Sequence, residues 1–267
     1  MTTSKSKEAE DSVVAEATKE LEEALQNADG YELNPSEVAV HLEVGGARLT
    51  HIFSRLLNRG ERINITAAAA QQEFRGDEII LDAGNSEEAY ANAWTNMIGD
   101  VQGYVLGGKP ASLEAAREKI PAQHKRAALD ATNQVRVKRG SELNEAFDLD
   151  SAGKSAVILE AKQGATTKEI GLLFSRPLND SELRQLQKRG MRFKQGLDGG
   201  LIVGSKDSLR LVEEFFDNLL TAVLGYEFDG KPVNAEKDWL KKIPIDHKAM
   251  AVGELRRRAT ARLADPS

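Results

Sequence analysis

The sequence predicts an α+β protein formed by tandem duplication of a β-α-β-β-α-α unit, with the two copies related by a pseudo-twofold axis and an acidic N-terminal helical extension in front. Three observations favour this fold: two nearly identical stretches, matched apolar helix patterns before them, and matched strand-length runs before those. Two copies in one chain most simply pack as an isologous dimer does.

The clearest repeat is the stretch GKPASLEAAREKIPAQHK at 108–125, which returns as GKPVNAEKDWLKKIPIDHK at 230–248. The Gly-Tyr, Gly-Lys-Pro, Lys-Ile-Pro and His-Lys groups recur at an offset of 122 or 123 residues. Proline suits the first turn of a helix because its φ is preset and it has no amide to leave unpaired. We therefore expect each Gly-Lys-Pro to end one helix and orient the next, and each Ile-Pro to interrupt that next helix.

Upstream of these stretches, both units show apolar residues spaced i, i+3, i+4 and i+7, the pattern of one buried helix face. They are Trp94, Met97, Ile98 and Val101 in the first unit and Phe216, Leu219, Leu220 and Val223 in the second. Strand-length runs precede them, at Ile79-Ile80-Leu81 and Leu201-Ile202-Val203.

Farther upstream the offset rises to 130, which predicts an eight-residue insertion between the two middle strands of the first unit. Val40, Leu42 and Val44 then match Ile170, Leu172 and Phe174 as half-buried strands. Arg59-Gly60 matches Arg189-Gly190 as a helix end closed by a left-handed glycine.

These matches divide the chain into four parts: an acidic extension at 1–34, a first unit at 35–140, a linker with a possible extra strand at 141–165, and a second unit at 166–267. Asn179-Asp180-Ser181-Glu182 predicts a helix start, with Glu182 placed to help cap it. Residues 8–27 are a helix candidate, for which a solvated acidic tail and a helix docked on the body both stay open.

Composition excludes several classes of protein. The 267 residues include no cysteine, which rules out a disulfide scaffold, a thiolate metal site and a cysteine nucleophile. No apolar run approaches a membrane span, and we expect a cytoplasmic protein. The net charge of −6 comes from residues 1–34, where nine Asp and Glu face three Lys and Arg, whereas the body carries 33 residues of each sign.

Motifs for catalysis and cofactor binding are weak. The segment DLDSAGKS at 148–155 ends like a phosphate-binding loop, but Asp148 stands where that loop needs glycine. His124 and His247 occupy paired positions without the further ligands that a metal requires, so we expect helix N-terminal or solvent-facing histidines. His41 is expected on a strand and His51 on a helix. No cofactor and no metal are predicted.

Each unit ends in a stretch rich in cations, HKRAALDATNQVRVKRG from His124 and HKAMAVGELRRRATARL from His247, both expected to be helical. We expect these helices to contact phosphates along a nucleic acid, duplex or non-specific, without reading bases. The expected contacts are Lys125, Arg126, Arg136, Arg139, Lys248, Arg256, Arg257, Arg258 and Arg262. An opposing interpretation is that long cationic side chains simply cover the margins of a buried helix face.

Three functions therefore stay open at this stage. The first is a non-enzymatic nucleic-acid-binding protein, and the second is a protein-interaction or assembly module without nucleic-acid contact, which includes a homo-oligomer. The third is a hydrolase whose site carries no recognisable motif. A steep salt dependence of duplex binding distinguishes the first from the second.

Overall fold

The computed structural model describes residues 30–69, 72–75, 78–81, 83–132, 134–138, 154–190, 192–195, 201–204, 206–233 and 237–264, together with 15, 18, 19, 21, 22 and 25. Within these residues the chain has a mixed α+β fold, as the sequence predicts, and its strands form several small sheets. Here the first half means residues 38–131 and the second half residues 155–264.

The first half begins with a β-hairpin and ends with a helix. Its elements are β2 (Val38–Val44), β3 (Ala47–Phe53), α2 (Arg59–Ala69), β4 (Gln72–Arg75), β5 (Glu78–Leu81), α3 (Ala83–Met97), β6 (Ile98–Gln102), β7 (Val105–Leu106), β8 (Lys109–Pro110), α4 (Leu113–Ala116) and α5 (Ala122–Ala131). Strands β2, β3 and β6 form one antiparallel sheet, and β7 pairs with β8.

The second half has a larger sheet and a longer final helix. Its elements are β10 (Ser155–Gln163), β11 (Thr166–Phe174), α6 (Asp180–Gly190), β12 (Arg192–Gln195), β13 (Leu201–Gly204), α7 (Lys206–Leu219), β14 (Leu220–Leu224), β15 (Tyr226–Phe228), β16 (Lys231–Pro232), α8 (Lys237–Leu240) and α9 (Ile245–Ala264). The sheet order is β14-β11-β10-β9, in which β9 (Val135–Val137) follows the first half in sequence. Strand β10 lies in the segment predicted as a linker.

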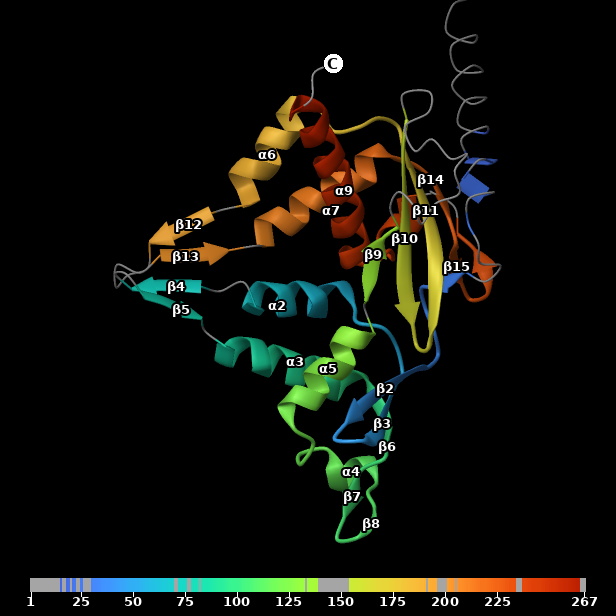
Figure 1. Cartoon of the computed structure of the whole chain (residues 1–267), viewed down its shortest axis with the longest axis vertical. Coiled ribbons are helices and arrows are strands. Elements are labelled where there is room, and N and C mark those ends of the chain that lie inside the picture. Colours follow the sequence, from blue (N-terminus) through green and yellow to red (C-terminus); the bar gives the residue numbers. More distant parts are fainter. Residues whose placement is uncertain are drawn as a thin grey trace, which may run out of the picture.

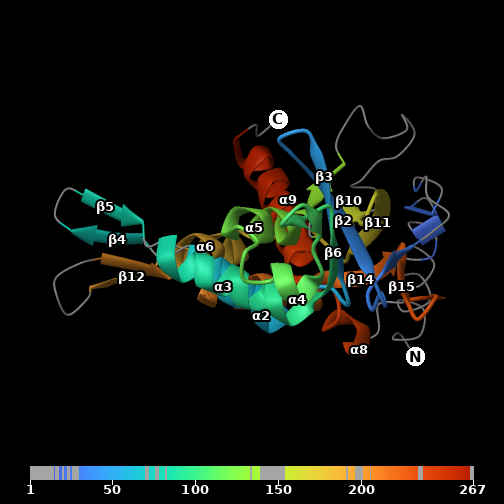
Figure 2. The ribbon, with the colours of Figure 1, turned by 90° about the horizontal axis from the view of Figure 1, so that it is seen from below.

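A four-stranded sheet joins the halves, with the order β12-β13-β4-β5. Its central pairing is antiparallel and sets Leu201 opposite Phe74 and Ile202 opposite Glu73. Each hairpin is connected to two helices of its own half, α2 and α3 or α6 and α7. Figures 1 and 2 show the hairpins extending to the left beyond these helices, away from the larger sheets.

Strands β2 and β3 form because their apolar residues alternate with polar ones, which gives one buried face. Val40 from β2 and Leu49 and Phe53 from β3 are buried on that face. The turn between the strands is Gly45-Gly46, whose φ values of 58° and 80° suit a two-residue hairpin turn. Trp94 from α3 is also fully buried, and the same core cluster continues into the second half.

The long apolar helices end sooner than the sequence predicts, because a strand follows each without a loop. Helix α3 ends at Met97, and Ile98 and Val101 lie on β6, opposite Phe53 and His51 of β3. The register of this pairing shifts at Phe53, so the buried positions of β6 fall three residues apart. A strand with such an irregularity shows the same i, i+3 spacing as a helix. The helix α7 and strand β14 repeat this arrangement, with a shift at Phe174.

Both Gly-Lys-Pro groups lie in β-structure, so the prediction that they start helices is wrong. Lys109-Pro110 is strand β8 and Lys231-Pro232 is strand β16. The turn before β8 is Gly107-Gly108, with φ values of 58° and 79°. The glycines therefore serve a tight hairpin turn. Each Ile-Pro group lies between two helices, as expected of a helix interruption: Ile120-Pro121 between α4 and α5, and Ile243-Pro244 between α8 and α9.

The 130-residue offset is also wrong. Arg59-Gly60 begins helix α2, whereas Arg189-Gly190 ends helix α6. The first half consequently has no insertion between its middle strands, because the longer connection is the one from β12 to β13. Gly60 is a helical residue rather than a left-handed cap. His51 lies on strand β3 and not on a helix.

The helix start predicted at Asn179 is confirmed. Asn179 accepts a hydrogen bond from the amide of Glu182, whose carboxylate accepts one from the amide of Asn179. This reciprocal arrangement is a capping box. Asn58 and Glu61 make the same two bonds at the start of α2.

The N-terminal segment contacts the second half. Leu21, from the helical residues before β1 (Tyr31–Glu32), is fully buried against Ala156, Ile158 and Leu173 of the large sheet. A Cβ on Gly171 would lie 2.7 Å from the Leu21 side chain, so a glycine is needed for this close approach. Strand β1 pairs in parallel with β15. Of the two alternatives left open for residues 8–27, the structure therefore shows the docked helix at the described residues.

Candidate anion-binding site between the two halves

The cations predicted in the first half lie on two different elements. Lys125 and Arg126 are on α5, which ends at Ala131, whereas Arg136 is on strand β9. The single helix expected from His124 onward is therefore wrong, because residues 135–137 pair with β10 instead. Arg139 lies outside the described residues.

The three described cations among these each already have a partner in the chain. The Lys125 ammonium lies 4.9 Å from the centre of the Trp94 ring, and its burial lowers the pKa of Lys125. Arg126 pairs with Asp130 at 3.7 Å, and the Arg136 Nε donates to the Glu160 carboxylate at 2.5 Å. An external phosphate would have to compete with these contacts.

Lys248 is not a surface cation. Its side chain is 1% exposed, and its Nζ lies 2.6 Å from the Asp217 carboxylate. The ammonium also lies 5.3 Å from the centre of the Phe216 ring. The prediction that Lys248 contacts phosphate conflicts with this burial, since breaking a buried ion pair leaves Asp217 without its cation.

The arginines of α9 differ among themselves. Arg257 and Arg258 both donate to the Glu254 carboxylate, and Arg258 also donates to the Ala156 carbonyl at 2.8 Å. Burial opposes ionisation of Glu254, but the two arginines outweigh it and lower its pKa to about 2. Arg256 is exposed and has no side-chain partner in the described part of the chain. Arg262 lies on α9, and its side chain is outside the described residues.

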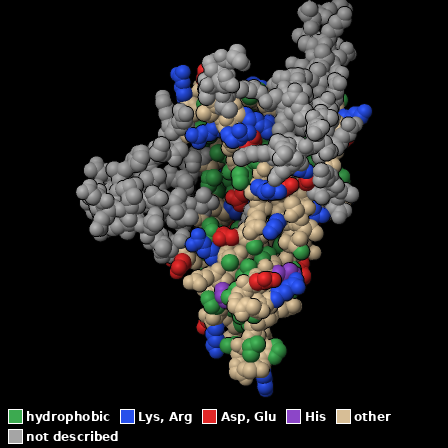
Figure 3. Space-filling view, in the orientation of Figure 1, with side chains coloured by type: hydrophobic (Ala, Val, Ile, Leu, Met, Phe, Trp, Pro, Cys, Tyr) green, Lys and Arg blue, Asp and Glu red, His purple; other side chains and the backbone are tan. Residues whose placement is uncertain are grey.

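Among the described residues, the predicted cations therefore lie on separate elements, and most of them are paired within the chain. Figure 3 shows Lys and Arg side chains in separate groups on one face, interspersed with Asp and Glu. Most of the predicted contacts stabilise the fold through neighbouring carboxylates or rings, as the interpretation based on covered helix margins suggests.

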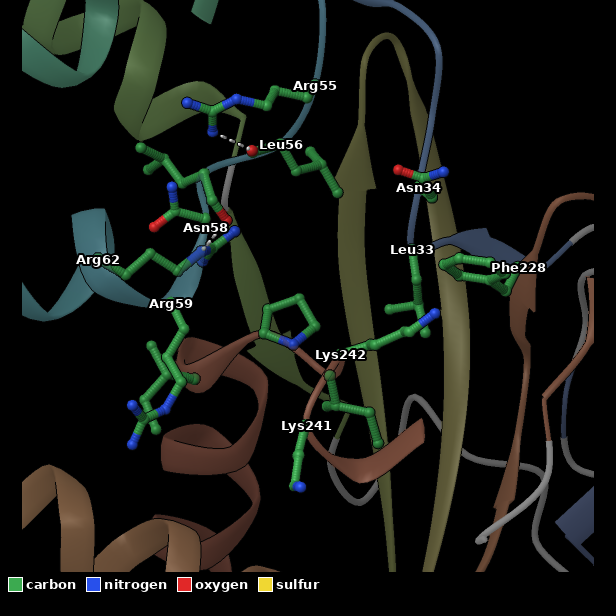
Figure 4. A pocket seen from close by; sticks show the side chains of 14 residues that line it. Leu33, Asn34, Arg55, Leu56, Asn58, Arg59, Arg62, Phe228, Lys241 and Lys242 are labelled. Atoms are coloured by element: carbon green, nitrogen blue, oxygen red, sulfur yellow. Dashed lines mark hydrogen bonds between the residues drawn. The ribbon is translucent and has the colours of Figure 1, made fainter. Parts of the chain in front are cut away.

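A different group of cations meets between the halves, around a pocket of about 410 Å³ that we call the basic pocket. It is bordered by the residues after β1, the segment from β3 into α2, the end of β15 and the segment from α8 into α9 (Figure 4). Its lining residues are Leu33, Asn34, Arg55, Leu56, Leu57, Asn58, Arg59, Arg62, Phe228, Lys241, Lys242, Ile243, Pro244 and Ile245. Five of these carry a positive charge and none carries a carboxylate.

The three arginines of the basic pocket are held in place by carboxylates outside its lining. Arg55 makes two hydrogen bonds of 2.7 Å to Glu61, the residue that also caps α2. Arg59 binds Glu213 of α7, and the buried Arg62 binds Asp246 of α9. The last two pairs link the first half to the second next to the basic pocket.

The two lysines supply its unbalanced charge. Lys242 places its ammonium 3.4 Å from the centre of the Phe228 ring and 4.7 Å from that of Trp239. Lys241 is exposed and has no carboxylate partner among the described residues. Figure 4 shows Lys242 extending toward Leu33 and Phe228 while Lys241 extends elsewhere. Each of the three arginines is paired with a carboxylate, whereas the two lysines are not. The basic pocket therefore has an excess of positive charge, which suits an anion.

The basic pocket was missed at the level of the sequence because its cations are far apart in the chain. A signal was nevertheless present, since FSRLLN at 53–58 returns as FSRPLN at 174–179 with an offset of 121 residues. Arg176 binds Glu182 in two hydrogen bonds, as Arg55 binds Glu61. The first of these repeated segments carries Arg55 to the pocket.

The buried histidines contact tyrosines instead of a ligand. His51 lies 3.0 Å from the Tyr104 hydroxyl, which in turn lies 3.1 Å from His124. His247 lies 2.8 Å from the Tyr226 hydroxyl in the first turn of α9, so it is helix N-terminal, one of the two expected placements, and at 1% exposure it does not face solvent. In the described part of the chain no cluster of His, Asp and Glu is arranged to hold a metal ion.

Among the described residues, no helix combines the length and the apolar character that crossing a bilayer requires. Comparisons with protein-family models, with curated proteins and with solved structures gave no match.

Proposed function

We propose that this chain is a non-enzymatic protein that binds the phosphate backbone of nucleic acid, with the basic pocket as its anchoring contact. One observation carries the proposal: five cationic side chains from both halves line one pocket without a lining carboxylate. Phosphate contacts of this kind give affinity without sequence preference.

The lysines are the primary phosphate ligands in this proposal. Arg55, Arg59 and Arg62 are each committed to a carboxylate, so they set the shape and the field of the pocket. Lys241 and Lys242 are point charges that can turn toward a phosphate without breaking an ion pair. Phe228 offers little for base stacking, because the Lys242 ammonium occupies its ring face.

We also propose that the halves arose by duplication of one unit. The same order of elements, the two Arg-Asn-Glu capping arrangements and the two tyrosine–histidine contacts support this origin. A head-to-tail relation is favoured over the pseudo-twofold. A twofold axis would pair equivalent strands of the two hairpins, whereas the second strand of one pairs with the first strand of the other.

Fluorescence anisotropy with a short labelled DNA duplex, titrated at several salt concentrations, tests the binding proposal. We expect the double variant Lys241→Gln/Lys242→Gln to bind more weakly and to flatten the log–log salt slope by about 2, because two phosphate contacts are lost.

The matched control is Lys109→Gln/Lys119→Gln, which removes the same charge from exposed lysines outside the basic pocket. It should leave the slope close to that of the unaltered protein. Equal effects of the two double variants would reject the pocket as the contact, and no duplex binding at low salt would reject nucleic acid as the partner. The latter result favours the alternative of a protein-assembly module, which the open sheet edges support.

A further inference from the structure

Among the described residues, the four-stranded sheet between the halves has two open edges. In the order β12-β13-β4-β5, the terminal strands β12 and β5 each have one strand neighbour among the described residues. An open edge presents unpaired backbone N–H and C=O groups, which can accept a further strand. Figures 1 and 2 show these hairpins extending away from the larger sheets.

The junction inside the chain shows how such edges fit together. Strand β13, the second of its hairpin, pairs antiparallel with β4, the first of the other hairpin. The open edges are the complementary set, since β12 is a first strand and β5 is a second strand. Directions alternate from β12 to β5, so an antiparallel β12 added to β5 would continue the same sheet.

We infer that a second copy of this chain adds its β12 edge to the β5 edge of the first, repeating between molecules the junction that β13 and β4 make within one. A second copy is the occupant because each molecule carries both halves of the contact. The edge sequences are also complementary in charge, EIIL on β5 being acidic and RFKQ on β12 basic.

This contact is heterologous, because two different edges meet. Two copies that exchange both contacts close the assembly, whereas copies that exchange one contact each form a chain that can lengthen. The inference is independent of anion binding, because neither edge belongs to the basic pocket.

Proline substitution tests each edge separately. Proline removes one backbone N–H and is tolerated at an edge where that N–H points outward. Because N–H direction alternates along a strand, one of two adjacent positions spares the hairpin. For β5 the variants are Ile79→Pro and Ile80→Pro, and for β12 they are Phe193→Pro and Lys194→Pro. The member of each pair that keeps the melting temperature of the unaltered protein is used.

Sedimentation velocity over a range of concentrations then measures assembly. We expect the unaltered protein to self-associate as concentration rises, and each edge variant alone to stay monomeric. An equimolar mixture of the β5 and β12 variants should form heterodimers and nothing larger, because one intact contact remains.

Three results would overturn the inference. The first is an unaltered protein that stays monomeric up to its solubility limit, which would also be the result if the edges bound another protein. The second is a single edge variant that associates as strongly as the unaltered protein, as a symmetric β5–β5 or β12–β12 contact would allow. The third is an equimolar mixture that remains monomeric.

Discussion

Lowering the pH from 7 to 5 should destabilise the fold through two buried histidines. Burial lowers the pKa of His51 to about 4 and that of His247 to about 3. Nearby positive charge adds to this effect, from His124 beside His51 and from Arg62 beside His247. Both rings are therefore neutral in the folded protein at pH 5.

The hydrogen bonds of His51 act in the same direction as its burial. The indole Nε1 of Trp94 can only donate, and it lies 3.0 Å from Nδ1 of His51, so Nδ1 accepts. The hydrogen of the neutral ring is then on Nε2, which donates to Tyr104. A second proton on Nδ1 would set two donors against each other in a buried site.

The direction of the pH effect on stability follows from whether the folded or the unfolded chain binds more protons. In the unfolded chain both histidines titrate near pH 6.5, so below that value the unfolded chain binds protons that the folded chain does not. The stabilisation is complete above pH 6.5 and is lost progressively as the pH falls toward the folded values. At pH 5 each histidine lowers the free energy of unfolding by about 2 kcal/mol, and the pair lowers it by about 4 kcal/mol. The free energy of unfolding of a typical protein is roughly 5–15 kcal/mol.

Urea unfolding followed by tryptophan fluorescence at pH 7, 6 and 5 measures this loss. Carboxylates with lowered pKa values, such as Glu182 and Glu254, lose stabilisation in the same direction but mainly at lower pH. The control is the double variant His51→Gln/His247→Gln, whose side chains keep hydrogen-bonding capacity and do not titrate. The reasoning is refuted if the unaltered protein is equally stable at pH 7 and pH 5, or if the double variant shows the same pH dependence.

Two further pairs of variants test the packing by chemical unfolding and thermal melting. Arg258→Ala should lower the free energy of unfolding by about 2 kcal/mol, because it removes hydrogen-bond donors from the Ala156 carbonyl and from buried Glu254. Arg256→Ala should change the free energy of unfolding by no more than about 0.5 kcal/mol. Equal losses would contradict the assigned contacts. Gly225→Ala should lower the stability of the fold more than Gly230→Ala does. Both glycines have a positive φ, which alanine adopts only with strain. In addition, a Cβ at Gly225 would collide with the Glu169 carbonyl, whereas a Cβ at Gly230 would contact nothing within 4 Å. A comparable drop in melting temperature for the two would count against the close approach at Gly225.

Local signals in the sequence were sufficient for part of the fold. The mixed α+β class and the capped helix start at Asn179 could be predicted because apolar periodicity and the Asn-x-x-Glu pattern act over a few residues. The ends of α3 and α7 could not, because a strand with an irregular register imitates helical spacing. Pairing with β3 and β11 decides those residues, and pairing is not local.

The site was harder to predict for the same reason. Lys248 looks like a surface cation in the sequence, and only the fold brings Asp217 to its ammonium, from 31 residues away. Arg62 and Asp246 are 184 residues apart in the chain, so the walls of the basic pocket are not adjacent in the sequence. The repeated FSR-x-LN segment would have given the correct offset between the two halves. It would not have shown which partners its arginines bind.

The docking of the N-terminal segment bears on the order in which the protein can acquire its structure during synthesis. Gly30 donates to the side chain of Glu227, 197 residues later, and Tyr31 packs against Tyr226. Gly30 and Tyr31 therefore cannot make these contacts until residues 226 and 227 have been synthesised, and the loop that the contacts close is long. Leu21 likewise cannot be buried until β10 and β11 have been synthesised, so a shorter nascent chain exposes this apolar side chain to chaperones.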